Sequence, residues 1–148
     1  MANGVTYYYS FKYKSDSLGA PVTEYEMVLR LGEQYLIRAE AEAELGQTVS
    51  ATSDLNAIRI RAGLDSTTAS SQQDLLTAIL HERQVELFTE WGHRWLDLIR
   101  SGTVNSVMGS PGNVCQEKRG TWSPDWQLYP ISLYELQHDP NLVQNAGY

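Results

Sequence analysis

The spacing of apolar residues over roughly residues 28–62 is typical of two successive helices. In the first, from about Val28 to Leu45, apolar side chains recur every three or four positions, and the glutamates fall largely on other faces. The second is expected from about Val49 to Ala62. We expect eight residues to face inward: Val28, Leu31, Tyr35, Ala39, Ala43, Leu55, Ile58 and Ala62. The two helices predict a helical hairpin.

Residues at the predicted helix ends support this hairpin. Thr23 and Glu26 have the spacing of a capping box and predict an early start for the first helix. Gly46 and Gly63 are natural stop residues after the first and second helix. The spacing is compatible with one tetratricopeptide-like unit, and such units normally need neighbours to bury their faces.

A third and longer helix is predicted from about Gln72 to Glu90, with Ser71 and Asp74 as a start signal. Its apolar arc also contains charged residues. Because burying an unpaired ion costs several kcal/mol, these charges must meet partners. The candidate partners are Arg59, Arg61, Arg83, Arg94 and Arg100. The sequence therefore predicts a structural ion network, and its proposed members are Arg83, Glu86, Glu90 and Arg94.

A metal or catalytic site is the alternative interpretation of this charged helix. A zincin motif requires a second histidine four residues after His81, but that position is Val85. The chain also has no GxSxG elbow, glycine-rich phosphate loop or CxxC pair. We therefore predict no catalytic residue, metal site or cofactor, and a protein that is not an enzyme.

The ends of the chain differ from this helical middle. Residues 7–13, "YYYSFKY", suit an extended segment or short strand. The predicted fold class is mainly α, a tetratricopeptide-like helical hairpin plus a long third helix, with irregular loop-rich termini. A length of 148 residues indicates a single domain over 1–148.

Charge and cysteine content exclude some classes of protein. Eleven basic and 18 acidic residues give a net charge of −7, without a dense basic run, so nucleic acid is not expected as a partner. Cys115 is the single cysteine and allows no internal disulfide. The sequence shows no run of about 18 apolar residues and no signal-peptide pattern at its start.

Four motifs in order carry a resemblance to a known family. They are "ERQVELFTE" from Glu82, "RWLDLIR" from Arg94, "PISLYE" from Pro130 and "QNAGY" from Gln144. Over about residues 24–148 the chain resembles the C-terminal region of the SusD/RagB family, which are bacterial outer-membrane lipoproteins that capture nutrients, chiefly glycans. Ser132 and Ala146 stand where the family usually has proline.

The resemblance implies non-enzymatic binding of an oligosaccharide or other nutrient at the cell surface. It also implies a SusC-like TonB-dependent transporter as partner and a surface-exposed location in the outer membrane. The chain lacks the signal and lipid-anchor cysteine of that family. The alternative function is a free-standing helical adaptor that binds a protein segment in its tetratricopeptide-like groove.

Sugar-binding chemistry is predicted in one loop-like stretch. Sugars are bound by aromatic faces that stack on their C–H surfaces, together with polar groups that satisfy the hydroxyls. The stretch "CQEKRGTWSPDWQLY" offers this mixture, and the candidate ligand-binding residues are Trp122, Asp125, Trp126 and Tyr129. The alternative is that Trp126 and Tyr129 simply pack beneath the segment at Pro130. Trp95 and Leu98 are expected to pack the short helix after "WGH".

Overall fold

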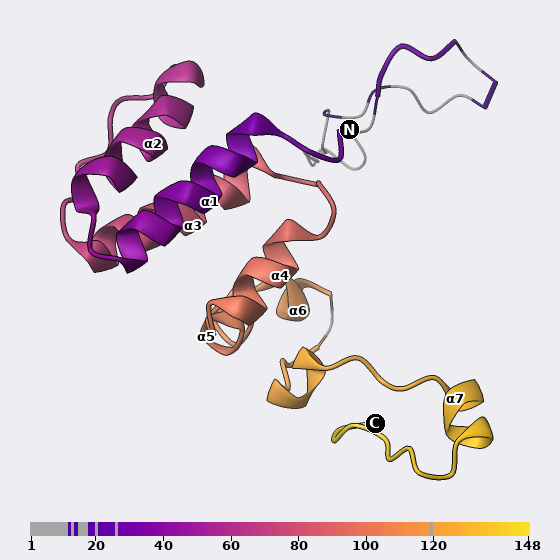
Figure 1. The fold of residues 1–148 in the computed structure, drawn as a ribbon. Helices are drawn as coiled ribbons and strands as arrows, with labels where there is room; N and C mark the ends of the chain where they lie inside the picture. Colours follow the sequence, from indigo (N-terminus) through magenta and orange to yellow (C-terminus); the bar gives the residue numbers. More distant parts are fainter. Residues whose placement is uncertain (1–11, 13, 15–17, 20, 26, 119) are drawn as a thin grey trace, which may run out of the picture. The chain divides into compact units, whose positions relative to one another are not determined.

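The computed structural model describes residues 12, 14, 18–19, 21–25, 27–118 and 120–148. The predicted extended segment at residues 7–13 lies outside these, except for Lys12. All regular structure in the described part of the chain is helical (Figure 1), which confirms the predicted fold class. The elements are α1 Leu31–Glu44, α2 Thr48–Arg61, α3 Gln72–Glu86, α4 His93–Arg100, α5 Val104–Met108, α6 Val114–Glu117, the 3-10 helix η1 Pro124–Gln127 and α7 Leu133–His138.

Packing contacts divide the chain into two compact units, residues 1–94 and residues 95–148. The first unit is built on α1, α2 and α3, and the second contains α5, α6, η1 and α7. The expectation of a single domain over 1–148 stays a prediction.

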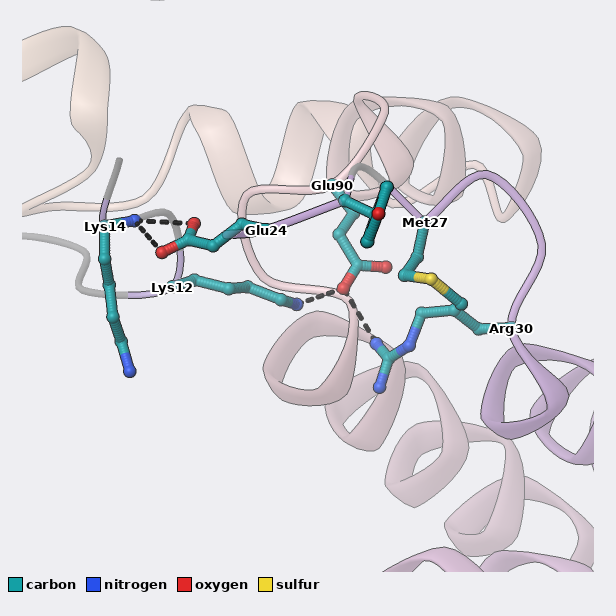
Figure 2. A pocket seen from close by; sticks show the side chains of 7 residues that line it. Lys12, Lys14, Glu24, Met27, Arg30 and Glu90 are labelled. Atoms are coloured by element: carbon teal, nitrogen blue, oxygen red, sulfur yellow. Dashed lines mark hydrogen bonds and ion pairs between the residues drawn. The ribbon is translucent and has the colours of Figure 1, made fainter. Parts of the chain in front are cut away.

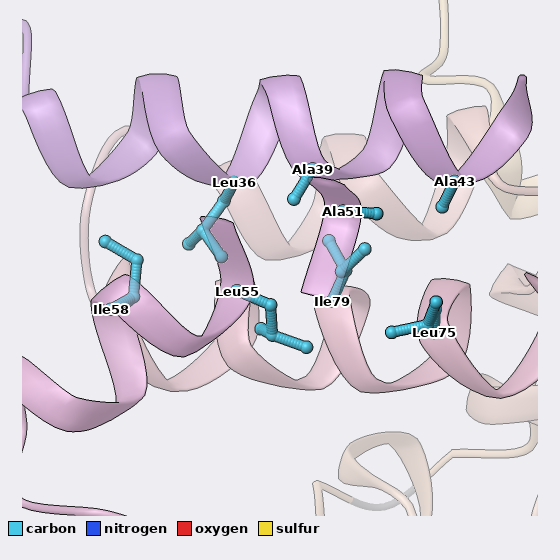
Figure 3. Close-up of a cluster of buried hydrophobic side chains, with 8 residues drawn as sticks. All are labelled: Leu36, Ala39, Ala43, Ala51, Leu55, Ile58, Leu75 and Ile79. Atoms are coloured by element: carbon cyan, nitrogen blue, oxygen red, sulfur yellow. The ribbon is translucent and has the colours of Figure 1, made fainter. Parts of the chain in front are cut away.

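The core of the first unit lies between its three long helices (Figure 3). It consists of Leu36, Ala39, Ala43, Ala51, Leu55, Ile58, Leu75 and Ile79. Three of these eight are alanines, whose small side chains let the helices approach closely. The hairpin of α1 and α2 predicted from the sequence is confirmed, and α3 packs against both helices.

The start of α1 differs from its prediction. The helix begins at Leu31, its N-cap Arg30 is in an extended conformation, and no side chain caps it. The predicted start at Thr23 is wrong, since Thr23 is not in a helix. Val28 and Leu31 are 63% and 74% exposed rather than inward-facing.

The inward-facing sets also need correction at two positions. Leu36 is fully buried in α1 although the sequence analysis did not select it. Ala62, predicted to face inward, lies just past the end of α2 and is exposed. The inward-facing positions within the helices were therefore predicted correctly apart from Leu36, and those predicted at the helix ends were wrong.

Three helix ends were predicted correctly from residues next to them in the sequence. Gly46 and Gly63 follow α1 and α2 with φ of +74° and +77°, a left-handed conformation that glycine adopts at little cost. At the start of α3, the Asp74 N–H donates to Ser71 Oγ at 3.1 Å. These predictions are confirmed.

The end of α3 comes at Glu86, four residues before the predicted end at Glu90. Thr89 and Trp91 have φ of +62° and +41°, so the backbone turns there. Two cations from distant segments take over the role of helical N–H donors. Arg30 Nη1 donates to the Glu86 carbonyl oxygen at 3.0 Å, and Lys12 Nζ to that of Phe88 at 3.2 Å. Cations are favoured at this end of a helix because its dipole is negative there.

Candidate functional site

The charged residues predicted as an ion network lie around the end of α3. The Glu90 carboxylate is 4% exposed and accepts from Arg30 Nη1 at 2.8 Å, and it also pairs with Lys12. Glu86 pairs with Arg30 as well, and with Arg61 Nη2 at 2.6 Å. The network therefore joins α3 to the residue before α1 and to the end of α2.

Three further pairs extend these charges across the first unit. Arg59 of α2 lies 3.0 Å from Glu82, and Arg83 lies 4.0 Å from Glu33 of α1. His93 Nδ1 is 3.6 Å from the same Glu33 carboxylate. Arg94, the fourth predicted member, has no ion pair among the residues that the structure describes.

One more pair ties α1 to α2 on the exposed side. Arg38 Nη2 donates to Asp54 Oδ1 at 2.7 Å, and the Arg38 guanidinium also lies over the ring of Tyr35. The hydrogen bond to Asp54 and then its negative charge raise the pKa of Arg38 above its ordinary value. Arg38 therefore stays charged at any ordinary pH.

A pocket of about 330 Å³ lies next to Glu90 (Figure 2). Its lining residues are Lys12, Lys14, Glu24, Tyr25, Met27, Arg30 and Glu90. Figure 2 shows the Lys12 and Arg30 side chains converging on the Glu90 carboxylate, while the backbone N–H of Lys14 donates to Glu24. The Glu90 carboxylate is neutralised by two cations of the same chain, an arrangement that suits a scaffold better than a metal or acid/base site. In the described part of the chain, no three histidine, cysteine, aspartate or glutamate side chains group as metal ligands would.

The candidate sugar-binding residues lie in the second unit and form an aromatic cluster. We use this name for Trp95, Trp122, Trp126 and Tyr129. Trp122 is central, with ring centroids 6.1 Å from both Trp95 and Trp126 and interplanar angles of 71° and 88°. The Tyr129 ring also contacts Trp95, with ring centroids 6.2 Å apart. Edge-to-face contacts of this kind stabilise a fixed arrangement of rings.

The outer members of the cluster reach solvent. Trp126, on η1, is 38% exposed, and Tyr129 is 72% exposed. Asp125, next to Trp126, is exposed too, whereas Trp122 is half-buried. The exposure of Tyr129 argues against the alternative that its ring packs beneath the segment at Pro130.

Two residues that the sequence analysis did not assign to the site support it. Trp95, expected only to pack α4, contacts both Trp122 and Tyr129. The Asn105 Oδ1 of α5 accepts from Trp122 Nε1 at 3.0 Å and from Gln127 Nε2 at 3.3 Å. The sequence around Asn105 gives no signal of this role, because the role depends on α5 folding beside the loop that carries Trp122 and Gln127.

The cluster carries groups of the kind that sugar binding uses. Exposed faces of Trp126 and Tyr129 can stack on C–H surfaces, and the Asp125 carboxylate can accept from a hydroxyl.

Comparison with known proteins identifies the class of protein. The SusD family matches residues 1–148, so the chain belongs to the SusD family, as the four motifs predicted. In the part of the chain that the structure describes, no helix has the length and apolar character needed to cross a membrane.

Individual relatives agree with this assignment. The SusD-like protein P38 of Formosa agariphila is 29% identical in an alignment of 147 residues that covers 93% of this chain and 27% of that protein. The starch-binding protein SusD of Bacteroides thetaiotaomicron is 32% identical over 123 residues, 82% of this chain and 21% of that protein. A crystal structure of a SusD-like protein from Bacteroides fragilis matches with a TM-score of 0.67 and 28% identity, over 83% of this chain and 26% of that one. The chain thus spans about a quarter of the length of these relatives.

Proposed function

We propose that this chain is part of a non-enzymatic nutrient-binding protein that captures glycans at the bacterial cell surface. Membership of the SusD family supports this proposal, and one relative is named as starch-binding. The observation that carries it is the aromatic cluster, which presents Trp126 and Tyr129 to solvent beside the Asp125 carboxylate. The sugar would lie on these rings, and Asp125 would bind its hydroxyls.

The proposal includes the location and the partner that the family implies. The whole protein would be held at the outer surface of the outer membrane and would pass its ligand to a SusC-like TonB-dependent transporter. The ion network in the first unit would act as scaffold, because its carboxylates are already neutralised by arginine and lysine side chains. The alternative function, a free-standing helical adaptor, has no support among the relatives described above.

Calorimetric titration tests the binding half of the proposal. Maltohexaose, cellohexaose and xylohexaose would be titrated into the chain and into Trp126→Ala. We expect weak binding of at least one hexamer, because a small open site places few groups on the ligand, and a loss of about fivefold or more in Trp126→Ala. Trp91→Ala is the matched control, since Trp91 is also exposed but lies in the first unit.

The same samples test the non-enzymatic half through release of reducing ends. No release is expected above the rate of buffer alone. Release of sugar would contradict the binding-protein proposal, and so would affinity that is lost equally in Trp91→Ala and Trp126→Ala.

A further inference from the structure

We infer that the segment Gln144–Tyr148 sets the arrangement of the aromatic cluster, and that its residues are positioning residues of the sugar site. The expected effect of this segment on sugar affinity rests on the proposed function. Its structural part concerns the loop of residues 122–131, which carries three of the four rings. No ring of this loop can present a fixed face unless its backbone is held.

Hydrogen bonds from the segment hold the second half of the loop. Gln144 binds both backbone groups of Ile131, because its Oε1 accepts from the N–H at 2.8 Å and its Nε2 donates to the carbonyl oxygen at 2.9 Å. Asn145 Nδ2 donates to the carbonyl oxygen of Tyr129 at 2.7 Å. The Tyr148 hydroxyl donates to that of Leu128 at 2.9 Å. Main-chain groups on either side of the Tyr129 ring are therefore fixed by side chains from one short segment.

Close packing adds a contact at Asp125. Gly147 has φ of +88°, and a Cβ on it would come within 2.7 Å of Asp125 Cβ. Only glycine combines this backbone conformation with this approach. The segment thus reaches the loop beside the Trp126 ring as well as beside Tyr129.

The first half of the loop is held separately. Asn105 binds Trp122 and Gln127 through one side-chain oxygen. Asn105 acts on the loop from α5, whereas the segment acts on residues 125, 128, 129 and 131. Loss of the segment's contacts should therefore free Tyr129 and Trp126 while Trp122 stays attached.

The test uses Gln144→Leu, with Gln137→Leu as matched control. Gln137 is an exposed glutamine of α7 in the same unit. Tyr148→Phe serves as a milder variant that removes one hydroxyl and keeps the ring. In Gln144→Leu, we expect exchange of the Ile131 amide hydrogen to rise about tenfold while amides of α1 to α3 keep their rates. The near-ultraviolet circular dichroism of the coupled tryptophans should weaken, and Tyr148→Phe should change it in the same direction by less.

Measurements of sugar affinity distinguish a positioning role of Gln144 from a merely structural one. Affinity for the best of maltohexaose, cellohexaose and xylohexaose should fall about fivefold in Gln144→Leu and stay at the original value in Gln137→Leu. A changed spectrum with unchanged affinity would overturn the inference, as would exchange and spectra equal to those of Gln137→Leu. If the original chain binds none of the hexamers, the proposed function fails, and the exchange and dichroism measurements decide the inference by themselves.

Discussion

At the scale of single residues, the buried charges of α3 show how much a sequence can say about an ion network. Glu82, Arg83 and Glu90 are all 5% exposed or less, as their place near or within an apolar arc indicates. Their partners come from other segments, as the pairs Arg59 with Glu82 and Arg30 with Glu90 show. Arg59 was a candidate partner from the sequence, whereas Arg30 was not. Periodicity reveals that a charge is buried, but only the folded chain reveals which cation is its partner.

Arg83→Leu should destabilise the protein much more than Lys118→Leu. Arg83 is 4% exposed and lies 4.0 Å from Glu33, so its removal leaves a carboxylate in a poorly solvated place, at a cost of about 3 to 5 kcal/mol. Lys118 is exposed, and its replacement should cost less than about 0.5 kcal/mol. Urea unfolding followed by helical circular dichroism measures both. Equal free energies of unfolding would mean that the network is solvated and not structural.

Glu90→Gln provides a second test of the network. Its carboxylate is 4% exposed and holds both Lys12 and Arg30, and loss of its charge should cost roughly 1.5 to 3 kcal/mol. Glu44→Gln is the matched control, because Glu44 is exposed at the end of α1. A free energy of unfolding that falls no more in Glu90→Gln than in Glu44→Gln would show that these ion pairs contribute nothing.

At the scale of elements, helix ends were predictable where the signal comes from the residues next to the end. Ser71 before α3 and the glycines after α1 and α2 act through neighbouring backbone groups, and the sequence placed those ends correctly. The start of α1 and the end of α3 depend on Arg30, whose guanidinium bonds to Glu86 and Glu90 and whose backbone is extended. Such ends cannot be read from local spacing, because the deciding contact spans more than fifty residues.

Ser71→Ala should weaken α3 at its first turn. The Ser71 hydroxyl accepts from the Asp74 N–H, and loss of such a cap typically costs about 1 kcal/mol. Ser53→Ala, at an exposed position inside α2, should leave stability within about 0.5 kcal/mol of the original value. Thermal unfolding of the two variants checks this difference, and a larger loss in Ser53→Ala would contradict the assigned cap.

Leu55→Ala tests the three-helix core directly. Leu55 is fully buried between the helices, so the cavity should cost about 2 to 5 kcal/mol. Leu45→Ala removes the same atoms from a side chain that is 73% exposed, and should cost far less. Similar melting temperatures for both variants would contradict the packing of α1, α2 and α3 described above.

At the scale of the whole molecule, the family could be predicted and the shape of the proposed binding site could not. Four ordered motifs indicated the SusD family, and the family match over residues 1–148 confirms it. Trp122, Trp126 and Tyr129 were selected by their chemistry, but Trp95 and Asn105 join them only through tertiary contacts. Leu31, Ile37 and Val49 are apolar side chains that the first unit leaves exposed. The chain spans about a quarter of the length of its relatives.

The indole N–H signals of the four tryptophans test the account most directly, because each reports on one ring. In proton–nitrogen spectra, addition of the best-binding hexamer should shift the signals of Trp122 and Trp126. The signal of Trp91, whose Nε1 donates to the Met27 carbonyl oxygen in the first unit, should stay in place. That result would place the sugar on the aromatic cluster. Spectra in which Trp122 and Trp126 stay fixed at saturating sugar, or in which Trp91 alone moves, would contradict the account.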